Sequence, residues 1–455
     1  MTGGKNKTFS FRTLRVFSFV LMAPVTIAPF AAQAQTSADN ARVEYVFKRG
    51  DTLVALAEKY MRKQSDYVTV QRLNRISNPR LIPVGKTVSI PFRLLKYRSS
   101  EASLSAFRGN VSIARRGQTL KPAKGLEISE GSRLATAAGS FLTLQLEDGS
   151  RISMPSNSKM RITRLRHILL TDSVDYELAV DSGRMRSKVT PFDKKHDRYR
   201  VRTPVAVSAV RGTDYRTRVD GETGTAFSET VEGAVDVAAG DSIDDAQVVA
   251  VPAGTGAAAT TTGALETAEL LAPPEILDPA KVQSEETLSF AVAPRDAASA
   301  HRIIISSDAG FVDIVAEKLV DSPVIDLPAI EDGRYFAKAT AVSKDGFEGM
   351  PAAYSFKRQL STLSGGAGQG DFGYRFKWSG AGKGKRLYRF QLLSGDKKSL
   401  PVVDEAGLTE DVITLSDLPD GEYFWRIGVT QYSSDPSDKE IFQKWTDFEK
   451  LTVAG

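Results

Sequence analysis

The chain has 455 residues, with 60 lysines and arginines, 55 acidic residues and no cysteine. The lack of cysteine excludes disulfides, cysteine nucleophiles and a lipid anchor on cysteine, but a chain of this length can bury enough surface without cross-links. The basic excess is local, because residues 41–98 hold 13 lysines and arginines against four acidic residues.

Residues 1–34 have the order of a secretory signal peptide. Basic residues precede an apolar run over 16–30, and Ala32-Gln33-Ala34 forms a small-residue motif, so we expect cleavage after Ala34. An uncleaved anchor is the alternative, but Pro24 and Pro29 interrupt a run that is short for a membrane helix. We therefore expect a protein of the periplasm or outer envelope of a Gram-negative bacterium, without an integral membrane anchor after cleavage.

Export changes which ligands the basic segment at 41–98 can reach. Nucleic acid is then out of reach, whereas anionic peptide stems, phospholipid headgroups and lipopolysaccharide are accessible. A solvated face that only aids solubility explains the same charge, so charge alone assigns no ligand.

The first predicted domain covers residues 43–92 and has the order βααβ. A strand at 46–47 leads to a turn at Gly50-Asp51, and Asp51 is a natural N-cap for the helix that follows. A second helix is expected over 68–74 and a closing strand over 87–90. One face of the first helix carries apolar residues at i, i+3, i+4 and i+7, namely Leu53, Leu56, Ala57 and Tyr60.

The two ends of this domain read YVFKRGDTL from Tyr45 and NPRLIPVGKTVSIP from Asn78. In these motifs the segment resembles a LysM domain, a small module that binds N-acetylated glycans such as peptidoglycan. The resemblance implies a shallow groove between the first turn and the loop after the second helix. The site residues that it implies are Gly50, Asp51, Thr52, Leu53, Asn78, Pro79, Arg80, Leu81 and Ile82.

Such a groove suits the chemistry of an N-acetyl group. The acetamide offers one carbonyl acceptor, one amide donor and a methyl group, which loop backbone and a leucine or isoleucine can satisfy. A single shallow site lacks the avidity of tandem copies, so modest, reversible binding is expected. The alternative is that Leu53 and Ile82 belong only to the core, and that Gly50 and Asp51 only form the turn.

The second predicted domain covers residues 100–255 and is β-rich, with short alternating runs separated by glycine turns. The motifs TPVAV at 203–207, VRGT at 210–213 and VEGAVDV at 231–237 resemble a FecR domain. In that family, a periplasmic β module links an outer-membrane transporter to a sigma factor. Those regulators carry a membrane helix where this chain has an export signal, so the resemblance implies only the fold and a protein-binding surface.

The C-terminal part is expected to form two β-sandwiches, at 272–358 and 370–455. Residues 253–271 are rich in Ala, Thr and Gly and are expected to be a linker, as is the glycine-rich stretch at 363–370. A weak repeat at an offset of 88 residues aligns LPAIEDGRYFAKA from Leu327 with LSDLPDGEYFWRI from Leu415. Both copies resemble fibronectin type III modules, which act as spacers or docking surfaces.

Catalytic motifs are absent from the sequence. The three histidines, His167, His196 and His301, lie far apart and match no zinc-binding spacing, and no Gly-x-Ser-x-Gly occurs. Paired carboxylates for glycan cleavage are not excluded by spacing, because they meet only in the fold. We expect no cofactor, no metal and no enzymatic activity.

The sequence therefore predicts a multidomain, mainly β, non-enzymatic scaffold in the cell envelope. Its expected partners are peptidoglycan and an unidentified envelope protein. A signalling adaptor acting through the FecR-like domain and a cell-wall hydrolase are the two alternative functions.

Overall fold

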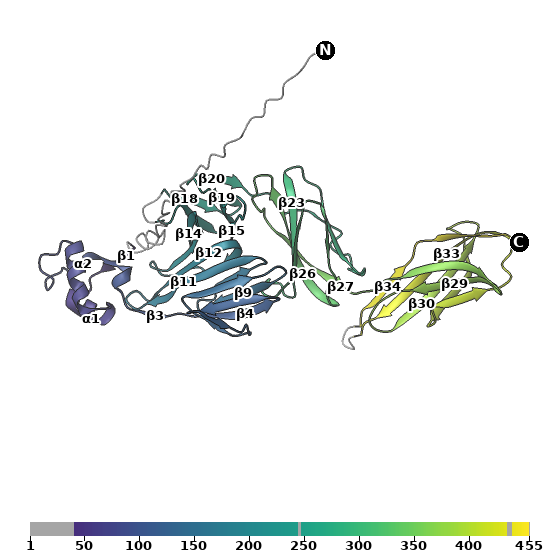
Figure 1. Ribbon diagram of the computed structural model, residues 1–455, viewed down its shortest axis with the longest axis horizontal. Coiled ribbons are helices and arrows are strands. Elements are labelled where there is room, and N and C mark those ends of the chain that lie inside the picture. The colour runs from purple at the N-terminus through teal and green to yellow at the C-terminus, as the bar shows by residue number, and fades with distance from the viewer. Residues whose placement is uncertain (1–40, 244–246, 435–438, 455) are drawn as a thin grey trace, which may run out of the picture.

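The computed structural model describes residues 41–243, 247–434 and 439–454. These residues form four units in a row, shown in Figure 1 from the N-terminal module at one end to the second sandwich at the other. The fold is mainly β, as the sequence predicted. The expected signal peptide lies outside the described residues. No helix among the described residues is long and apolar enough to span a bilayer.

The N-terminal module has the predicted βααβ order. Its two strands pair antiparallel, from Arg42↔Pro91 to Val46↔Thr87. The predicted face of the first helix is buried at Leu53, Leu56 and Ala57. The elements are β1 (Arg42–Val46), α1 (Leu53–Tyr60), the 3₁₀ turn η2 (Gln64–Asp66), α2 (Tyr67–Leu73), β2 (Thr87–Pro91) and the 3₁₀ turn η3 (Phe92–Leu94).

This module is packed on the next unit and is not tethered by a flexible linker. Leu94, Leu95 and Ile168 belong to the same buried apolar cluster as the helices. The Tyr97 ring also lies between two guanidinium groups, 5.4 Å from Arg62 and 4.3 Å from Arg166. The N-terminal module and the unit after it therefore share a core at their junction.

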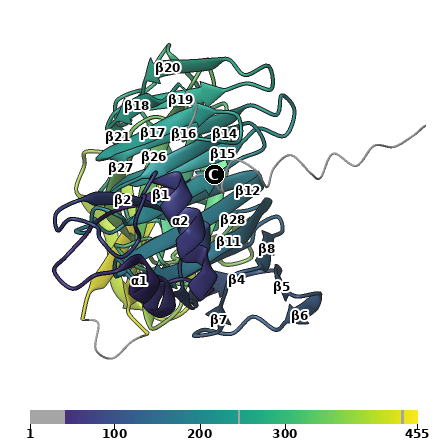
Figure 2. The same cartoon turned by 90° about the vertical axis from the view of Figure 1, so that its left-hand side faces the viewer.

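The strands of the central domain form two sheets that close into a barrel around one apolar core, and Figure 2 shows them between β4 near the bottom and β20 at the top. The first sheet contains β3 (Tyr97–Ser99), β5 (Val111–Arg115), β6 (Gln118–Leu120), β8 (Ser132–Thr136), β11 (Ser158–Ile168), β13 (Arg198–Arg202), β14 (Ala206–Val210), β17 (Ala234–Ala239) and β18 (Val249–Pro252). The second contains β4 (Ala102–Arg108), β7 (Glu127–Ile128), β9 (Phe141–Leu146), β10 (Arg151–Met154), β15 (Asp214–Val219), β16 (Ala226–Glu232), β19 (Thr255–Ala259) and β20 (Leu265–Glu269).

The long strand β12 (Ser173–Lys188) joins the two sheets. Its first part pairs with β11 and its last part, from Gly183, pairs with β15. Gly183 has φ +78°, and a Cβ there would lie 2.4 Å from the carbonyl oxygen of Asn157. Glycine is therefore needed at this bend for both backbone angle and space.

The expected linker at 253–271 is instead part of this domain, so that prediction was wrong. Strand β19 pairs with β16, and β20 pairs with β19. Ala257 and Ala259 are buried in the domain core. The prediction assumed that a run of small residues cannot form a core. In the structure, the small alanine side chains of β19 fit into the closely packed core beside β16.

A seven-stranded sandwich and then an eight-stranded sandwich follow the central domain. The first contains β21 (Ile276–Leu277), β22 (Leu288–Val292), β23 (Ala298–Ser306), β24 (Ile314–Val320), β25 (Val324–Leu327), β26 (Gly333–Ser343) and β27 (Ala352–Arg358). The second contains β28 (Ser364–Gly370), β29 (Gly373–Ser379), β30 (Arg386–Ser394), β31 (Pro401–Leu408), β32 (Val412–Leu415), β33 (Gly421–Tyr432), β34 (Ile441–Trp445) and β35 (Glu449–Val453).

The glycine-rich stretch at 363–370 was also expected to be flexible, but it contains strand β28. This strand pairs with β29 over seven residues without a bulge. Gly365 packs against the core, since a Cβ there would lie 2.9 Å from the Trp425 ring. Glycine in this strand thus makes room for a large neighbouring side chain.

The 88-residue repeat corresponds to the same local structure in both sandwiches. The Tyr335 hydroxyl donates to the carbonyl of Glu331 at 3.0 Å, and the Tyr423 hydroxyl donates to that of Pro419 at 2.9 Å. Each bond links a tyrosine to the residue four positions before it, in the manner of a tyrosine corner. The repeat therefore marks equivalent corners of two sandwiches.

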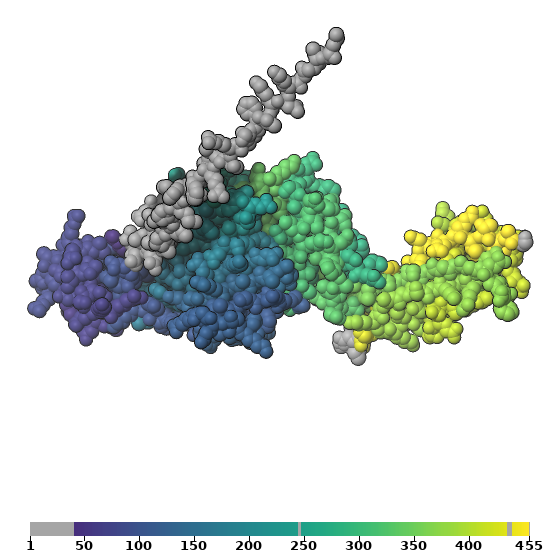
Figure 3. Space-filling model, in the orientation of Figure 1, coloured from purple at the N-terminus to yellow at the C-terminus, as the bar shows by residue number. Residues whose placement is uncertain are grey.

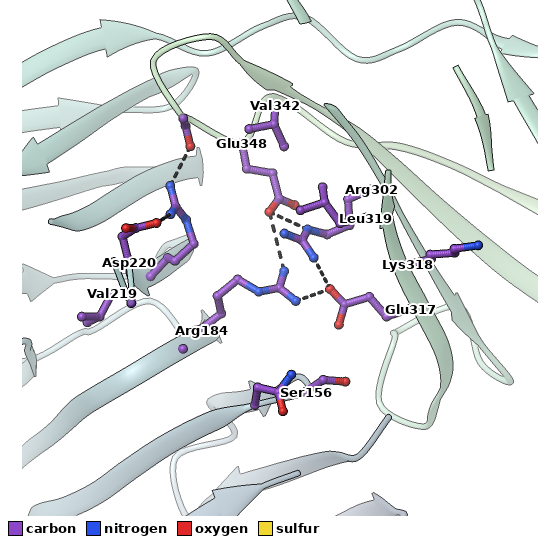
Figure 4. Close-up of a pocket in the computed structure, with 15 residues that line it drawn as sticks. Ser156, Arg184, Val219, Asp220, Arg302, Glu317, Lys318, Leu319, Val342 and Glu348 are labelled. Carbon is purple, nitrogen blue, oxygen red and sulfur yellow. Dashed lines mark hydrogen bonds and ion pairs between the residues drawn. The ribbon is translucent and has the colours of Figure 1, made fainter. Parts of the chain in front are cut away.

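The central domain and the first sandwich are joined by buried charges (Figure 4). Arg302 contacts Glu317 at 2.5 Å and Glu348 at 3.0 Å, and Arg184 of β12 forms ion pairs with both carboxylates. Beside them, the rings of Phe227 and Phe347 meet edge to face. Buried, mutually paired charges tolerate little displacement, so this junction holds the two units in one orientation.

The two sandwiches meet over a smaller region, and Figure 3 shows a narrow waist between them. The Gln431 side chain donates to the carbonyl of Leu360 at 2.9 Å, and Lys357 pairs with Glu440 at 2.6 Å. The Glu440 carboxylate is half exposed, so it contributes little to the energy of the contact.

Candidate glycan-binding site

Two loops leave the same end of the β1–β2 sheet. β1 ends at Val46 and β2 begins opposite it at Thr87. The backbone N–H of Phe47 donates to Lys86, and that of Gly85 donates back to Phe47, at 2.9 and 2.8 Å. The first loop, residues 47–52, and the second loop, residues 77–86, are thereby held at one end of the module. They contain all the sequence-predicted site residues except Leu53, which is the first residue of α1.

The first loop is a tight turn. The N–H of Asp51 donates to the carbonyl of Lys48 at 3.1 Å, and Gly50 adopts φ +90°. The Asp51 carboxylate accepts from the Lys48 N–H and from the Tyr45 hydroxyl, both at 2.8 Å. Burial, together with this bond to Asp51, raises the pKa of Tyr45.

The prediction that Asp51 caps α1 was wrong, because its carboxylate is used inside the turn. The N-cap is Thr52, which has extended backbone and accepts from the Ala55 N–H at 3.1 Å. A threonine hydroxyl satisfies one of the unpaired N–H groups of the first helical turn.

Replacing Thr52 with alanine is expected to destabilise α1 by about 1 kcal/mol, the usual value of an N-cap. Amide hydrogen exchange across Leu53–Tyr60 should then become about fivefold faster, since 1.4 kcal/mol corresponds to roughly a factor of ten. A Thr52→Ser variant keeps the hydroxyl and should exchange like the wild type. Equal exchange in the alanine variant and the wild type would contradict the cap.

The second loop also contains a turn. The Asn78 side-chain oxygen accepts from the Arg80 N–H at 3.0 Å, and the backbone carbonyl of Asn78 accepts from the Leu81 N–H at 3.2 Å. Pro79 occupies the second position of this turn, which its fixed φ favours. Asn78 therefore shapes the loop, and its side-chain oxygen is already engaged.

The apolar residues of the site differ in exposure. Leu53 is completely buried in the module core, so its side chain cannot contact a glycan methyl group, contrary to the expectation for that residue. Ile82 is half-buried against the same core. Leu81 is 77% exposed and Val84 is 68% exposed, so the second loop offers these two apolar side chains to a ligand.

Backbone donors on the two loops are available for a ligand. Within the ranges 41–243, 247–434 and 439–454, the N–H groups of Gly50, Thr52 and Ile82 have no hydrogen-bond partner. The side chains of Lys48, Arg49, Arg80 and Lys86 are exposed around them. The loops thus combine free amide donors, one exposed leucine and positive charge.

Asn74, which the sequence analysis missed, holds the start of the second loop in place. Its side-chain amide donates to the carbonyls of Val70 and Ser89 and accepts from the Ser89 N–H, all at 2.8 Å. It links the end of α2 to β2. An asparagine directly after a helical run is a recognisable C-terminal signal, but its partner on β2 could not be deduced from sequence.

Among the described residues, no group of three or more histidine, cysteine, aspartate or glutamate side chains could hold a metal ion. His167 lies 2.5 Å from Asp172, in a pair on the surface of the central domain.

Comparison with protein-family models identifies two domains. Residues 45–91 match the LysM domain model, and residues 132–236 match the model described as FecR protein. The chain therefore contains a LysM domain, which includes both loops, and a FecR domain, which lies within the central domain. No match to a curated protein is found.

Solved structures resemble parts of the chain weakly. An anti-sigma factor from Parabacteroides distasonis is 17% identical over 30% of this chain, with a TM-score of 0.25, and the match spans 59% of that protein's chain. A two-domain fibronectin type III segment of chicken tenascin is 14% identical over 40% of this chain and 98% of its own, with a TM-score of 0.20. Fibronectin(III)-like modules of Clostridium thermocellum CbhA are 12% identical over 40% of this chain and 93% of their own chain, with a TM-score of 0.18.

Proposed function

We propose that the protein is an exported, non-enzymatic scaffold that binds peptidoglycan through its LysM domain and presents the FecR domain and the sandwiches to another protein of the cell envelope. The observation that supports it most is the pair of loops with free backbone N–H groups beside the exposed Leu81. An acetamido group needs both a donor for its carbonyl oxygen and an apolar contact for its methyl group.

Two junctions support the role as a scaffold. The LysM domain shares a buried cluster with the FecR-containing central domain, and that domain is locked to the first sandwich by buried ion pairs. A partner bound to the distal units would thus be held at a defined position relative to the glycan. The expected location is the periplasm or outer cell envelope.

The test is co-sedimentation of the full chain with insoluble peptidoglycan. Leu81→Asp should weaken binding about tenfold, because the contact with the methyl group is replaced by a charge that requires water. The matched control is Val68→Asp, which introduces the same charge at a valine that is 40% exposed on α2. Equal pelleting of the two variants would contradict recognition by the loops.

A salt series distinguishes groove binding from attraction by the basic loops. Exposed charges are screened strongly at high ionic strength, whereas amide and methyl contacts are not. Binding that persists in salt and depends on Leu81 supports the proposal. If binding disappears in salt and is unchanged by Leu81→Asp, the attraction is due to the basic side chains of Lys48, Arg49, Arg80 and Lys86.

A second candidate function is that of an envelope signalling adaptor, and the FecR match at 132–236 favours it. Recovery of an outer-membrane transporter with the full chain, and not with a chain lacking 132–236, would support this function. A cell-wall hydrolase is the remaining alternative, for which clearing of peptidoglycan in a zymogram would be required.

A further inference from the structure

A pocket lies between the central domain and the first sandwich. It has a volume of about 190 Å³. Strands β9, β10 and β12 supply one wall, and the loop after β23 together with β26 and β27 supplies the other. We call it the basic pocket, lined by Thr143, Arg151, Ser153, Arg186, Lys188, Ala309, Gly310, Phe311, Val312, Lys338 and Ala353.

Lys338 is the central residue of the basic pocket. It is 9% exposed, and its ammonium group lies 3.7 Å from the centre of the Phe311 ring. In the part of the chain that the structure describes, the ammonium makes no hydrogen bond or ion pair. A buried lysine without an anionic partner is rare, because removing its charge from water is costly.

The equivalent position of the second sandwich shows how such a cation is normally satisfied. Arg426 lies 88 residues later, and its guanidinium donates to Gln391 at 2.9 Å and stacks 4.3 Å from the Trp445 ring. Lys338 has the aromatic contact but lacks the hydrogen-bond acceptor. The missing partner at Lys338 is therefore a property of the junction and not of the sandwich fold.

The other cations of the pocket are also available. Within the described ranges, Arg151 and Lys188 form no ion pair, and Arg186 uses Nε and Nη2 on Asp214. None of the lining residues is acidic. Nearby Asp308 accepts backbone N–H groups of Val312 and Asp313, so its charge is directed into its own loop.

The hydroxyl groups that line the pocket are occupied. Thr143 donates to the carbonyl of Val312 at 2.8 Å, and it lies 3.3 Å from the Ser153 hydroxyl. Gly310 leaves space for the arginine, since a Cβ there would lie 2.8 Å from Arg151 Nη1. The donors that remain free all carry positive charge, and they approach the pocket from both units.

The geometry points to an anion site: we propose that the basic pocket binds a phosphate group, as inorganic phosphate or a phosphomonoester, with Lys338, Arg151 and Lys188 as its cationic partners. A dianion with several acceptor oxygens can accept from cations that approach from different sides, which a single planar carboxylate does less well. Because β12 and β26 would both contact it, the anion would also bridge the two units.

The pKa of Lys338 should respond to a bound anion. Burial, then repulsion by Arg186, lowers its pKa to about 7, with Asp214 opposing and Arg216 and Lys188 adding to the repulsion. A bound anion would raise this pKa, so binding near neutral pH should take up a proton. The charged groups that face Lys338 from the surrounding strands are Arg151, Arg186, Lys188, Asp214, Arg216, Glu229 and Glu348.

The experiment is isothermal titration of the full chain at pH 7.5 with inorganic phosphate and with glycerol phosphate, in two buffers of different ionisation enthalpy. We expect binding accompanied by proton uptake, and at least tenfold weaker binding by Lys338→Met. The matched control is Lys344→Met, at an exposed lysine outside the pocket. Vesicles that contain phosphatidylglycerol form a third arm, which tests a lipid phosphodiester as the source of the group.

Absence of binding by both phosphate ligands, or binding that Lys338→Met leaves unchanged, would overturn the proposal, as would binding to vesicles alone. Folding of the variant is checked by its pH dependence. The folded pKa of Lys338 lies below its usual value of 10.5, so wild-type stability should rise between about pH 7 and 10.5. That rise should be lost in Lys338→Met if the lysine is buried as described.

Discussion

Glu348→Ala is expected to cost about 3–5 kcal/mol of stability at the junction of the central domain and the first sandwich, the usual effect of breaking a buried ion pair on one side. The Glu348 carboxylate contacts Arg302 at 3.0 Å and Arg216 at 3.2 Å, and accepts from the Thr340 hydroxyl at 2.9 Å. Its removal leaves buried guanidinium groups from both units with too few acceptors. Calorimetry of the full chain should show both units melting at a lower temperature.

A matched control is Glu331→Ala, which removes an exposed partner of Lys383. Surface pairs of this kind contribute about 0–1 kcal/mol, so little change is expected. If both variants melted like the wild type, the buried ion pairs would not hold the two units together.

The same carboxylate predicts a pH dependence. Burial opposes its ionisation, but Arg216, Arg302 and Arg184 outweigh burial and hold the pKa of Glu348 well below its usual value of 4.5. A carboxyl group with a depressed pKa stabilises the fold above its unfolded pKa, and this contribution is lost as the pH falls. The melting temperature of the junction should therefore fall below about pH 4.5, and less steeply in Glu348→Ala.

Trp425→Ala should destabilise the second sandwich by about 3–5 kcal/mol, as expected for deleting a large core side chain. Trp425 is 1% exposed, and its ring packs edge to face on Phe376 at 5.2 Å. It belongs to a cluster separate from that of the first sandwich. Calorimetry should show an early transition for the second sandwich, with the other transitions unchanged.

Trp445→Ala is the control for this variant, since Trp445 is only half-buried and stacks on Arg426. Trp445→Ala should destabilise the second sandwich clearly less than Trp425→Ala. A single transition that shifts as a whole in Trp425→Ala would contradict the independence of the two sandwich cores.

Much of the fold could be predicted from local sequence patterns. The spacing of Leu53, Leu56 and Ala57 predicted the buried face of α1. The glycine turns expected between short strands of the second domain include the turn from β9 to β10, where Gly149 has φ +89°. Such features depend on neighbours a few residues apart. The 88-residue repeat predicted two related sandwiches, because each copy is a short motif that can be read directly from the sequence.

Features that depend on distant partners were not predicted. The alanines of β19 were interpreted as a linker because their burial arises only from pairing with β16. The Asp51 carboxylate accepts from the hydroxyl of Tyr45, six residues away, and Thr52 caps α1 in its place. The ion pairs of Arg184 with Glu317 and Glu348 join residues more than 130 positions apart, and no local pattern indicates them.

The candidate site shows the same division. The turn at Gly50 and the burial of Leu53 follow from local patterns, whereas the bond from Asn74 to Ser89 of β2 joins residues 15 positions apart. The structure therefore removes Leu53 from the proposed apolar contact and leaves Leu81, Ile82 and Val84 to provide it, and it adds Asn74 as the residue that holds the second loop.

The most direct test of glycan recognition is nuclear magnetic resonance of the isotope-labelled full chain titrated with an oligomer of N-acetylglucosamine. We predict that the largest shifts belong to the backbone amides of Gly50, Thr52 and Ile82, whose N–H groups have no partner among the described residues. Shifts confined to other parts of the chain, or no shifts at millimolar oligomer, would contradict the account.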